Sequence, residues 1–298
     1  MIKILLLGKN GQVGWELQRS LATLGEVIAL DRNSTGYCGD LADLNGLATT
    51  IQVIMPEVVV NAAAYTAVDK AETDEVSAQL INSQAVEVLA KETAKLGALL
   101  VHFSTDYVFD GEGRHFREED EKTNPLNIYG KTKREGEMTV SRYNPQHLIF
   151  RTSWVYAARG NNFAKTISAL IKNKEALSVI DDQIGAPTGA ELIADCTAIA
   201  IRKVLEHKDN YGIYHLVSSG ETSWYGYAKY LHELLQQLGV PLVVKDISAV
   251  TSNAFPTTAK RPRNSRLSNR KLSSVFNINI PDWKHGISRL ISELEDVK

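Results

Sequence analysis

Residues 1–14 read MIKILLLGKNGQVG, an apolar run followed by glycines with the spacing GxxGxxG (Gly8, Gly11 and Gly14). The run is typical of a buried strand, and the next residues, Trp15–Leu24, form an amphipathic helical pattern. Glycines between a strand and a helix let the backbone turn sharply and approach a pyrophosphate, which the free N–H groups of the helix start can bind. The stretch therefore predicts a dinucleotide-binding fold, although a glycine triplet alone also suits a plain tight turn.

Four further apolar runs follow in the first half of the chain, separated by helical patterns such as Glu72–Leu96. The runs are rich in Val, Ile and Leu and nearly continuous, as expected for parallel strands that are buried on both faces. The five predicted strands are Ile2–Gly8, Glu26–Asp31, Glu57–Asn61, Ala98–Ser104 and His147–Arg151. This steady order of strand and helix predicts an α/β fold with a Rossmann-type, doubly wound parallel sheet.

The pattern changes near residue 152, where loops lengthen and helices predominate. We expect loops over Ser153–Gly160, Asp181–Gly189 and Val244–Ser265, and helices over Asn161–Lys172, Glu191–Leu205, Ser223–Leu238 and Pro281–Leu294. The sequence contains no internal repeat and no Gly/Ser-rich linker. We therefore predict an NAD(P)-binding domain over residues 1–152 and a smaller, mainly substrate-binding lobe over residues 153–298. The lobe packs on the sheet, the boundary is approximate, and the chain can cross between the two parts.

The composition argues against several classes of protein. The 298 residues carry 33 basic and 35 acidic side chains, a net charge of -2, whereas a nucleic-acid-binding protein usually has a strong basic excess. No apolar run approaches the roughly 18 residues that a bilayer-spanning helix needs, and the first residues lack the features of a signal peptide. Cys38 and Cys196 are far apart and lack CxxC spacing, which argues against disulfides and zinc. We expect a cytoplasmic protein with no nucleic-acid or membrane partner.

Two charged residues follow the second predicted strand and bear on the choice of cofactor. Asp31 lies 20 residues after Gly11, where an acidic side chain accepts hydrogen bonds from the ribose hydroxyls of NAD. Arg32 follows directly and can instead pair with the 2′-phosphate of NADP. Both NADH and NADPH therefore remain open, as does the interpretation of the two residues as solvated loop charges.

The segment Tyr129-Gly-Lys-Thr-Lys133 places a phenol and an ammonium group one helical turn apart. A nearby cation stabilises a tyrosinate and lowers the pKa of the phenol. Such a tyrosine can exchange a proton with a carbonyl or hydroxyl oxygen while hydride moves to or from the adjacent carbon. A second YxxxK segment, Tyr225–Lys229, lies in an apolar helical stripe and is interpreted as packing. Thr105 follows the predicted strand Ala98–Ser104, where its hydroxyl can orient a carbonyl.

The combination of these motifs resembles the extended short-chain dehydrogenase/reductase family. The resemblance extends from the first strand almost to the C-terminus. It is carried by Gly8–Leu17, Asn61–Ala71 (NAAAYTAVDKA), Ser104–Gly111 (STDYVFDG), Pro125–Lys133 (PLNIYGKTK), Arg151–Tyr156 (RTSWVY), Asn161–Lys165, Asp182–Ala190 (DQIGAPTGA) and Arg261–Leu267 (RPRNSRL). The resemblance implies an oxidoreductase that uses NADPH or NADH to reduce the C4 ketone of dTDP-4-dehydro-β-L-rhamnose to dTDP-L-rhamnose.

The resemblance also implies roles for individual residues. Tyr129 would be the proton donor, Lys133 its partner and a ligand of the nicotinamide ribose, and Thr105 the third catalytic residue, where many relatives have serine. The cofactor contacts carried over are Gly11, Gln12, Val13, Asp31, Asp40, Leu41, Ala64, Tyr65 and Thr66. The substrate contacts carried over are Thr105, Asp106 and Trp154, although Trp154 also suits a buried core position.

A basic run near the C-terminus suits the diphosphate of a sugar nucleotide. Lys260–Arg266 contains four cations in seven residues. Arginine binds phosphate oxygens in a bidentate manner, so Arg261 and Arg263 are candidate substrate ligands. The alternative is a solvated basic loop.

A metal site and a homodimer are implied by the resemblance alone. Some family members are magnesium-dependent homodimers in which glutamates from separate helices gather near the interface, and other members lack the metal. The matching positions in this sequence are Glu16, Glu191 and Glu293.

Two other functions fit the same fold. One is a nucleotide-sugar epimerase or 4,6-dehydratase; Thr105-Asp106-Tyr107 contains an acid but no following glutamate, which disfavours a dehydratase. The other is a non-catalytic regulatory subunit that keeps the fold only to bind a dinucleotide. The intact pair of Tyr129 and Lys133 disfavours that alternative.

Overall fold

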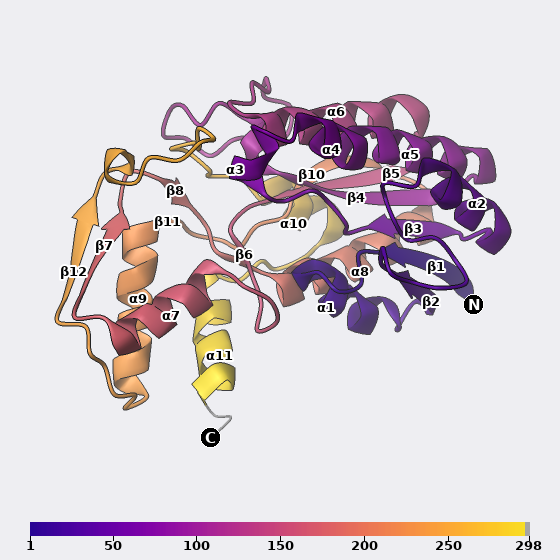
Figure 1. Ribbon diagram of the computed structural model, residues 1–298. Coiled ribbons are helices and arrows are strands. Elements are labelled where there is room, and N and C mark those ends of the chain that lie inside the picture. The colour runs from indigo at the N-terminus through magenta and orange to yellow at the C-terminus, as the bar shows by residue number, and fades with distance from the viewer. Residues whose placement is uncertain (296–298) are drawn as a thin grey trace.

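The computed structural model describes residues 1–295 and is built on a six-stranded parallel sheet with the strand order β10-β5-β4-β3-β1-β2 (Figure 1). Its strands are β1 (Ile2–Leu7), β2 (Gly25–Leu30), β3 (Val58–Asn61), β4 (Leu99–Thr105), β5 (His147–Thr152) and β10 (Gly212–His215). The order reverses between β1 and β3, and ligands of such sheets bind in the crevice at this switch point. The predicted α/β fold with a doubly wound parallel sheet is confirmed.

Helices cover both faces of this sheet (Figure 1). Alternate strand residues point to opposite faces, so Ile4 and Leu6 belong to one apolar cluster while Leu5 and Leu7 belong to another. The first cluster includes residues of α1 (Gln12–Leu21), α8 (Ala190–His207) and α10 (Arg270–Phe276). The second includes residues of α2 (Leu44–Ile54), α5 (Ala85–Leu96) and α6 (Ile128–Tyr143).

The helical pattern over Glu72–Leu96 forms one nearly continuous helical segment that contains a π-helical turn. It consists of α4 (Glu75–Gln79), the π turn η1 (Leu80–Gln84) and α5. Such π turns are often found at functional sites. Here the turn brings the buried Asn82 to the backbone of Tyr65: its Oδ1 accepts the Tyr65 N–H (2.9 Å) and its Nδ2 donates to the Tyr65 carbonyl (3.1 Å). The π turn therefore fixes the segment that follows β3.

A smaller lobe has its own apolar cluster, separate from the two on the sheet. It contains α7 (Phe163–Asn173), α9 (Trp224–Gln237) and α11 (Trp283–Glu295), beside the parallel pair β7 (Ala176–Ile180) and β12 (Asp246–Val250). The expectation of a loop over all of Val244–Ser265 is therefore wrong at its start. β12 forms because it pairs with β7, where Ile247 lies opposite Leu177, 70 residues earlier in the chain. The pairing also buries Ile247.

The second half of the chain also contributes to the sheet. β10 is its edge strand beside β5, and α8 packs against α1. The division near residue 152 stays a prediction. The remaining short elements are α3 (Val68–Ala71), η2 (Asp106–Val108), β6 (Val155–Tyr156), β8 (Ile184–Gly185), β9 (Thr188–Gly189), β11 (Thr222–Ser223) and η3 (Ser252–Ala254). Among the described helices, none combines the length and hydropathy of a bilayer-spanning segment.

Candidate active site

The glycine turn lies at the switch point of the sheet, between the carboxyl ends of β1 and β3. Gly8 has a φ of +88°, and a Cβ at this position would lie 2.7 Å from the Ala63 backbone nitrogen. A Cβ on Gly14 would lie 2.0 Å from the Gly8 carbonyl oxygen. Side chains at either position would therefore force the turn, β3 and α1 apart. No side chain caps the N-terminus of α1 at Gly11, so its first N–H groups are available to a pyrophosphate.

Hydrogen bonds to its side chain fix the position of Asp31 at the end of β2. Its Oδ1 accepts the Asn33 N–H (3.1 Å) and the Ser34 hydroxyl (2.9 Å), and its Oδ2 accepts from Asn10. The Ser34 hydroxyl bond is the main cause that holds the pKa of Asp31 below its usual value. Arg32 is exposed. The carboxylate therefore faces neutral donors from the glycine turn and from its own loop.

The other predicted cofactor residues follow the carboxyl ends of the same three strands. Gln12 and Val13 begin α1, Ala64, Tyr65 and Thr66 follow β3, and Asp40 and Leu41 follow β2. Gly39 brings the last pair beside Asp31, since a Cβ there would lie 2.6 Å from the Asp31 carbonyl oxygen. The Leu41 side chain is buried in the apolar cluster under α2 and α5, so only its backbone is available to a ligand.

Tyr129 and Thr105 meet where α6 begins beside the end of β4. The Asn127 side chain caps α6 by accepting the Gly130 N–H (2.8 Å), which fixes the first turn that carries Tyr129. Tyr129 is half-buried as a residue, but desolvation of its phenol raises the pKa to about 12, while a hydrogen bond with the Thr105 side chain acts in the opposite direction. The lowering that we expected from a nearby cation is therefore wrong: burial raises this pKa, and the charge of Lys133 is not among its causes. The phenol is protonated at neutral pH, as a proton donor must be.

Lys133 lies one turn further along α6 and is 2% exposed. Its Nζ donates to the Phe103 carbonyl (2.6 Å) and lies 3.2 Å from Nε2 of His102. Burial lowers the pKa of Lys133 to about 8, and the charge of Glu137 acts in the opposite direction. The predicted pair is therefore brought to one site together with a histidine that sequence reasoning missed. Its only signal is a polar residue within the apolar strand Leu99-Leu-Val-His-Phe103.

Asp106 is a buried carboxyl group beside Thr105. Its Oδ1 accepts from the Thr105 hydroxyl (3.1 Å), and its Oδ2 has no hydrogen-bond partner. Burial raises the pKa of Asp106 to about 6 despite hydrogen bonds from Ser265 and Thr105. The hydroxyls of Thr152 and Ser153, at the end of β5, are also buried and unpartnered. These groups near the carboxyl edge of the sheet, two of which sequence reasoning missed, can bind the hydroxyls of a polar ligand.

A cavity of about 1320 Å³ lies between the loop that follows η2 and the smaller lobe. Polar and basic side chains line one part of it, and Phe163, Trp224 and Phe255 line another. Of the two predicted phosphate ligands, Arg261 donates to Asp69 (2.6 Å) and has a buried, unpartnered Nε, while Arg263 is largely exposed. Both belong to the cavity wall, which suits a ligand with a charged part and an apolar part.

Trp154, a predicted substrate contact, packs against another tryptophan. One face of its indole stacks on Trp224, with ring centroids 3.5 Å apart and an interplanar angle of 13°. Its edge also meets Gly185, where a Cβ would lie 2.8 Å from the ring. Trp224, rather than Trp154, is among the residues that line the cavity. The contact of Trp154 with a substrate stays a prediction.

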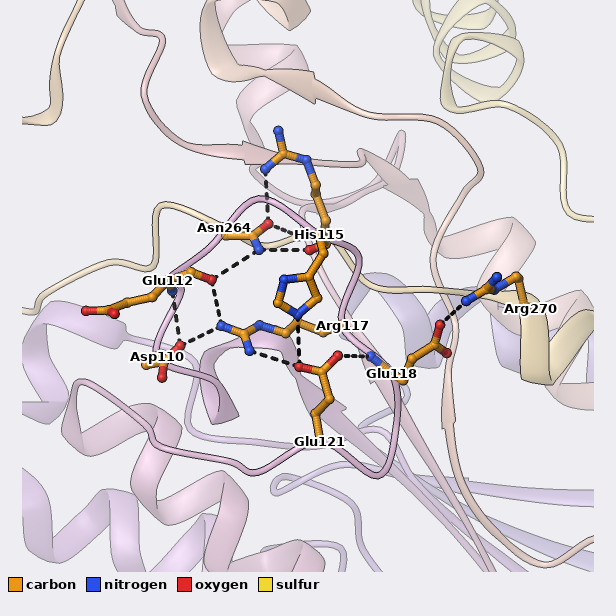
Figure 2. A network of polar contacts seen from close by, with 9 residues as sticks. Asp110, Glu112, His115, Arg117, Glu118, Glu121, Asn264 and Arg270 are labelled. Atoms are coloured by element: carbon orange, nitrogen blue, oxygen red, sulfur yellow. Dashed lines mark hydrogen bonds and ion pairs between the residues drawn. The ribbon is translucent and has the colours of Figure 1, made fainter.

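The loop between η2 and α6 is attached to the basic segment by a network around Arg117 (Figure 2). The Arg117 guanidinium donates to Asp110 (2.7 Å) and Glu121 (2.9 Å). Its backbone pairs with the C-terminal segment, donating to the Arg266 carbonyl (2.9 Å) and accepting from Ser268 (2.8 Å). Burial opposes ionisation of Glu121, but hydrogen bonds from Glu118, His115 and Arg117 lower its pKa to about 2. The network therefore fixes the segment that carries Arg261 and Arg263.

Glu16, Glu191 and Glu293 come from α1, α8 and α11 and lie near one another. Burial raises the pKa of Glu16, and the charges of Glu191 and Glu293 add to this effect. Arg289 is already paired with two of them: its Nε lies 3.0 Å from Glu293 and 3.7 Å from Glu191. Within residues 1–295, no three acidic, histidine or cysteine side chains are grouped closely enough to hold a metal ion. One chain by itself therefore does not provide the predicted metal site.

Known proteins resemble this chain in both sequence and fold. The family model described as "RmlD substrate binding domain" matches residues 2–296. The chain is 54% identical to dTDP-4-dehydrorhamnose reductase of Escherichia coli, over 98% of each chain. Its structure is similar to a crystal structure of that enzyme from Clostridium acetobutylicum (37% identity, 99% and 100% of the chains, TM-score 0.88). A Bacillus anthracis dTDP-4-dehydrorhamnose reductase in complex with NADP is 31% identical over 98% and 99% of the chains, with a TM-score of 0.87.

Proposed function

This chain belongs to the RmlD substrate binding domain family, and we propose that it reduces the C4 ketone of dTDP-4-dehydro-β-L-rhamnose to dTDP-L-rhamnose with NADPH or NADH. The observation that carries the proposal is the group of Tyr129, Thr105 and Lys133 at the carboxyl end of β4, in the same sheet as the glycine turn. A protonated phenol next to a hydroxyl and a buried amine is suited to donate a proton to a ketone oxygen. The enzyme is an NAD(P)H-dependent oxidoreductase, and we place it in the cytoplasm.

The residues of this chain have separate roles in the proposed reaction. The glycine turn and the N-terminus of α1 hold the pyrophosphate of the cofactor, which supplies the hydride when bound. Thr105 orients the ketone oxygen by hydrogen bonding, and Tyr129 donates its proton to the same oxygen as negative charge develops there. Lys133 binds the nicotinamide ribose and stabilises the resulting phenolate. Asp106 contributes a buried oxygen for a sugar hydroxyl.

We propose that the large cavity takes the dTDP part of the substrate. Arg261 and Arg263 neutralise the diphosphate, and the buried Nε of Arg261 is a free donor for it. Arg261 lies near Tyr107, since its charge acts to lower the pKa of that phenol against the effect of burial. Arg261 is therefore close to both the cavity and the catalytic group. The Tyr107 ring packs edge-on against Tyr129 at 5.6 Å between centroids. A sugar joined to the diphosphate therefore has a path toward Tyr129, and we keep Trp154 as a proposed contact of that sugar.

The cofactor preference depends on Asp31 and Arg32. Because a charge-assisted hydrogen bond contributes about 1.5–3 kcal/mol, Asp31→Ala is expected to raise the KM for NADH roughly tenfold or more. It should lower the KM for NADPH, since the repulsion of the 2′-phosphate is removed. Arg32→Ala is the matched variant and should raise the KM for NADPH alone. Initial rates with both cofactors measure these effects; an unchanged KM ratio in both variants would assign cofactor choice to other residues.

The proposed reaction is tested by the absorbance of reduced nicotinamide. Purified protein is mixed with enzymatically prepared dTDP-4-dehydro-β-L-rhamnose and either NADPH or NADH. Rapid oxidation that yields dTDP-L-rhamnose supports the proposal. Folded protein that binds the dinucleotide but oxidises neither cofactor would overturn it. Tightly retained NAD without net consumption would then favour an epimerase, and binding without any turnover would favour a regulatory subunit.

We propose that the chain forms a homodimer and that Mg²⁺ binds Glu16, Glu191 and Glu293 only across its interface. The reason is that these glutamates share one surface, while the described part of one chain groups no complete set of ligands. Sedimentation velocity with Mg²⁺ and with EDTA tests this proposal. A dimer that dissociates in EDTA supports it. A monomer in Mg²⁺, or a dimer that EDTA leaves intact, would contradict it.

A further inference from the structure

His102 lies behind Lys133 on the face of the sheet that α6 covers. It is 1% exposed, and its Nε2 lies 3.2 Å from the Lys133 Nζ. Its Nδ1 lies 3.2 Å from Nδ2 of Asn61, which is its register neighbour on β3. Three buried polar side chains from β3, β4 and α6 therefore form one row that ends at the catalytic group.

The position of the imidazole hydrogen follows from Asn61. The Oδ1 atom of Asn61 accepts the Ala63 N–H (3.2 Å), so the amide nitrogen Nδ2 is the atom that faces His102. An amide nitrogen only donates, and Nδ1 of His102 must therefore accept. A neutral imidazole carries one hydrogen, which then lies on Nε2 and points at Lys133.

The Lys133 nitrogen can accept this hydrogen only as a neutral amine, because an ammonium group has no lone pair. One of the two amine hydrogens is used, since Nζ donates to the Phe103 carbonyl (2.6 Å). The other is left for the site. Burial acts in the same direction: it lowers the pKa of Lys133 to about 8, so that the ammonium form is still the main one at neutral pH, and it lowers the pKa of His102 well below its usual range.

We propose that His102 is a positioning residue for Lys133: its Nε2–H, fixed by Asn61, faces the lysine nitrogen, opposes the ammonium form and so eases the release of a proton from Lys133 toward the site. The row ends at Asn61, and a carboxamide does not pass protons onward. Lys133 therefore exchanges protons only with groups on the site side. This inference deepens the proposed function, and only its kinetic test rests on that function.

The groups that face Lys133 determine what a pH profile reports. The titratable and charged ones are His102 from β4, and Tyr129 and Glu137 from α6 itself. Glu137 favours the ammonium form, but it is already paired with Arg151 of β5. Because the pKa of Lys133 is lowered, the ammonium form is lost as the pH rises through about 8. An alkaline limb in the rate profile therefore reports Lys133.

The tautomer of His102 can be measured without any turnover. Long-range ¹H–¹⁵N correlation spectra distinguish Nε2–H from Nδ1–H, and His102→Gln identifies the signals of this residue among the seven histidines. We expect a neutral ring near pH 6, and a hydrogen on Nε2 once the pH exceeds the Lys133 pKa of about 8. An Nδ1–H tautomer above that pH, or a protonated ring near pH 6, would overturn the proposal while leaving the proposed reaction untouched.

The kinetic test uses Asn61→Asp, a nearly isosteric change. A carboxylate accepts Nδ1–H, which turns Nε2 into an acceptor and favours the Lys133 ammonium. We expect the histidine to switch tautomer and the alkaline limb of kcat/KM to rise by about one pH unit, a change of about 1.4 kcal/mol.

A double variant and a matched control separate this effect from others. In Asn61→Asp with His102→Gln, most of the rise should disappear, because the path through the imidazole is removed. A rise that persists would mean that the new charge acts directly on Lys133, and would overturn the role of His102. His147→Gln removes another buried histidine, at the start of β5, and should leave the limb in place. Absence of turnover in the wild type would instead reject the proposed function.

Discussion

Replacement of Tyr129 by phenylalanine is expected to lower kcat by about a thousandfold, within the range that general acid catalysis typically contributes. The phenol is the acidic group paired with the Thr105 hydroxyl, and its raised pKa keeps it protonated at neutral pH. Phenylalanine keeps the ring that packs against Tyr107. Dinucleotide binding should therefore change little while turnover is lost. Single-turnover rates and fluorescence titration with NADPH measure the two effects separately.

The chain contains its own control for this experiment. Tyr225 belongs to the second YxxxK segment, but it lies on α9 and packs against the apolar cluster of the smaller lobe. Tyr225→Phe should leave kcat within about twofold of the wild type, because it keeps the packed ring, and substitutions away from buried polar or functional groups usually change little. Near-normal turnover in Tyr129→Phe would remove Tyr129 from the mechanism. A large loss in both variants would indicate damage to the fold rather than to the chemistry.

The sheet is predictable because its strands are buried on both faces. A strand such as β4 then appears in the sequence as a nearly continuous apolar run, and the glycine turn after β1 fixes which end of the sheet holds the site. β10 does not show this pattern. Gly212–His215 is only four residues long, and it becomes a strand because it pairs with β5, more than 60 residues earlier. Its position at the sheet edge depends on tertiary contacts that periodicity does not report.

The catalytic group is only partly predictable for a related reason. Tyr129 and Lys133 are four residues apart on one helix, so their proximity follows from helix geometry. His102 and Asn82 act through partners far away in the sequence. Asn82, for example, donates from the π turn to the Thr132 hydroxyl (3.2 Å), 50 residues later. A polar residue inside an apolar segment signals that a partner exists, but only the fold identifies the partner.

The buried ion pair of Glu137 and Arg151 leads to the second large expected effect. Glu137 accepts two hydrogen bonds from Arg151, both 2.8 Å long, and the side chains are 0% and 1% exposed. Glu137→Gln keeps the shape but leaves the arginine charge buried without its counterion. Because breaking a buried pair leaves an uncompensated charge, we expect the free energy of unfolding to fall by about 3–5 kcal/mol. Urea denaturation followed by circular dichroism measures the change.

Two further variants test whether the burial of the ion pair causes this loss of stability. Lys245 and Glu175 form an ion pair 3.2 Å long whose side chains are 75% and 71% exposed. Glu175→Gln should therefore cost less than about 1 kcal/mol. The double variant Glu137→Met with Arg151→Met removes both buried charges and should recover much of the loss. If Glu137→Gln costs no more than Glu175→Gln, the pair is not a main stabiliser of this region. If the double variant is no better than the single one, the loss comes from packing. Glu137 lies one helical turn beyond Lys133. The expected loss of stability in Glu137→Gln would therefore also imply that this ion pair fixes α6 to the sheet directly behind the catalytic lysine.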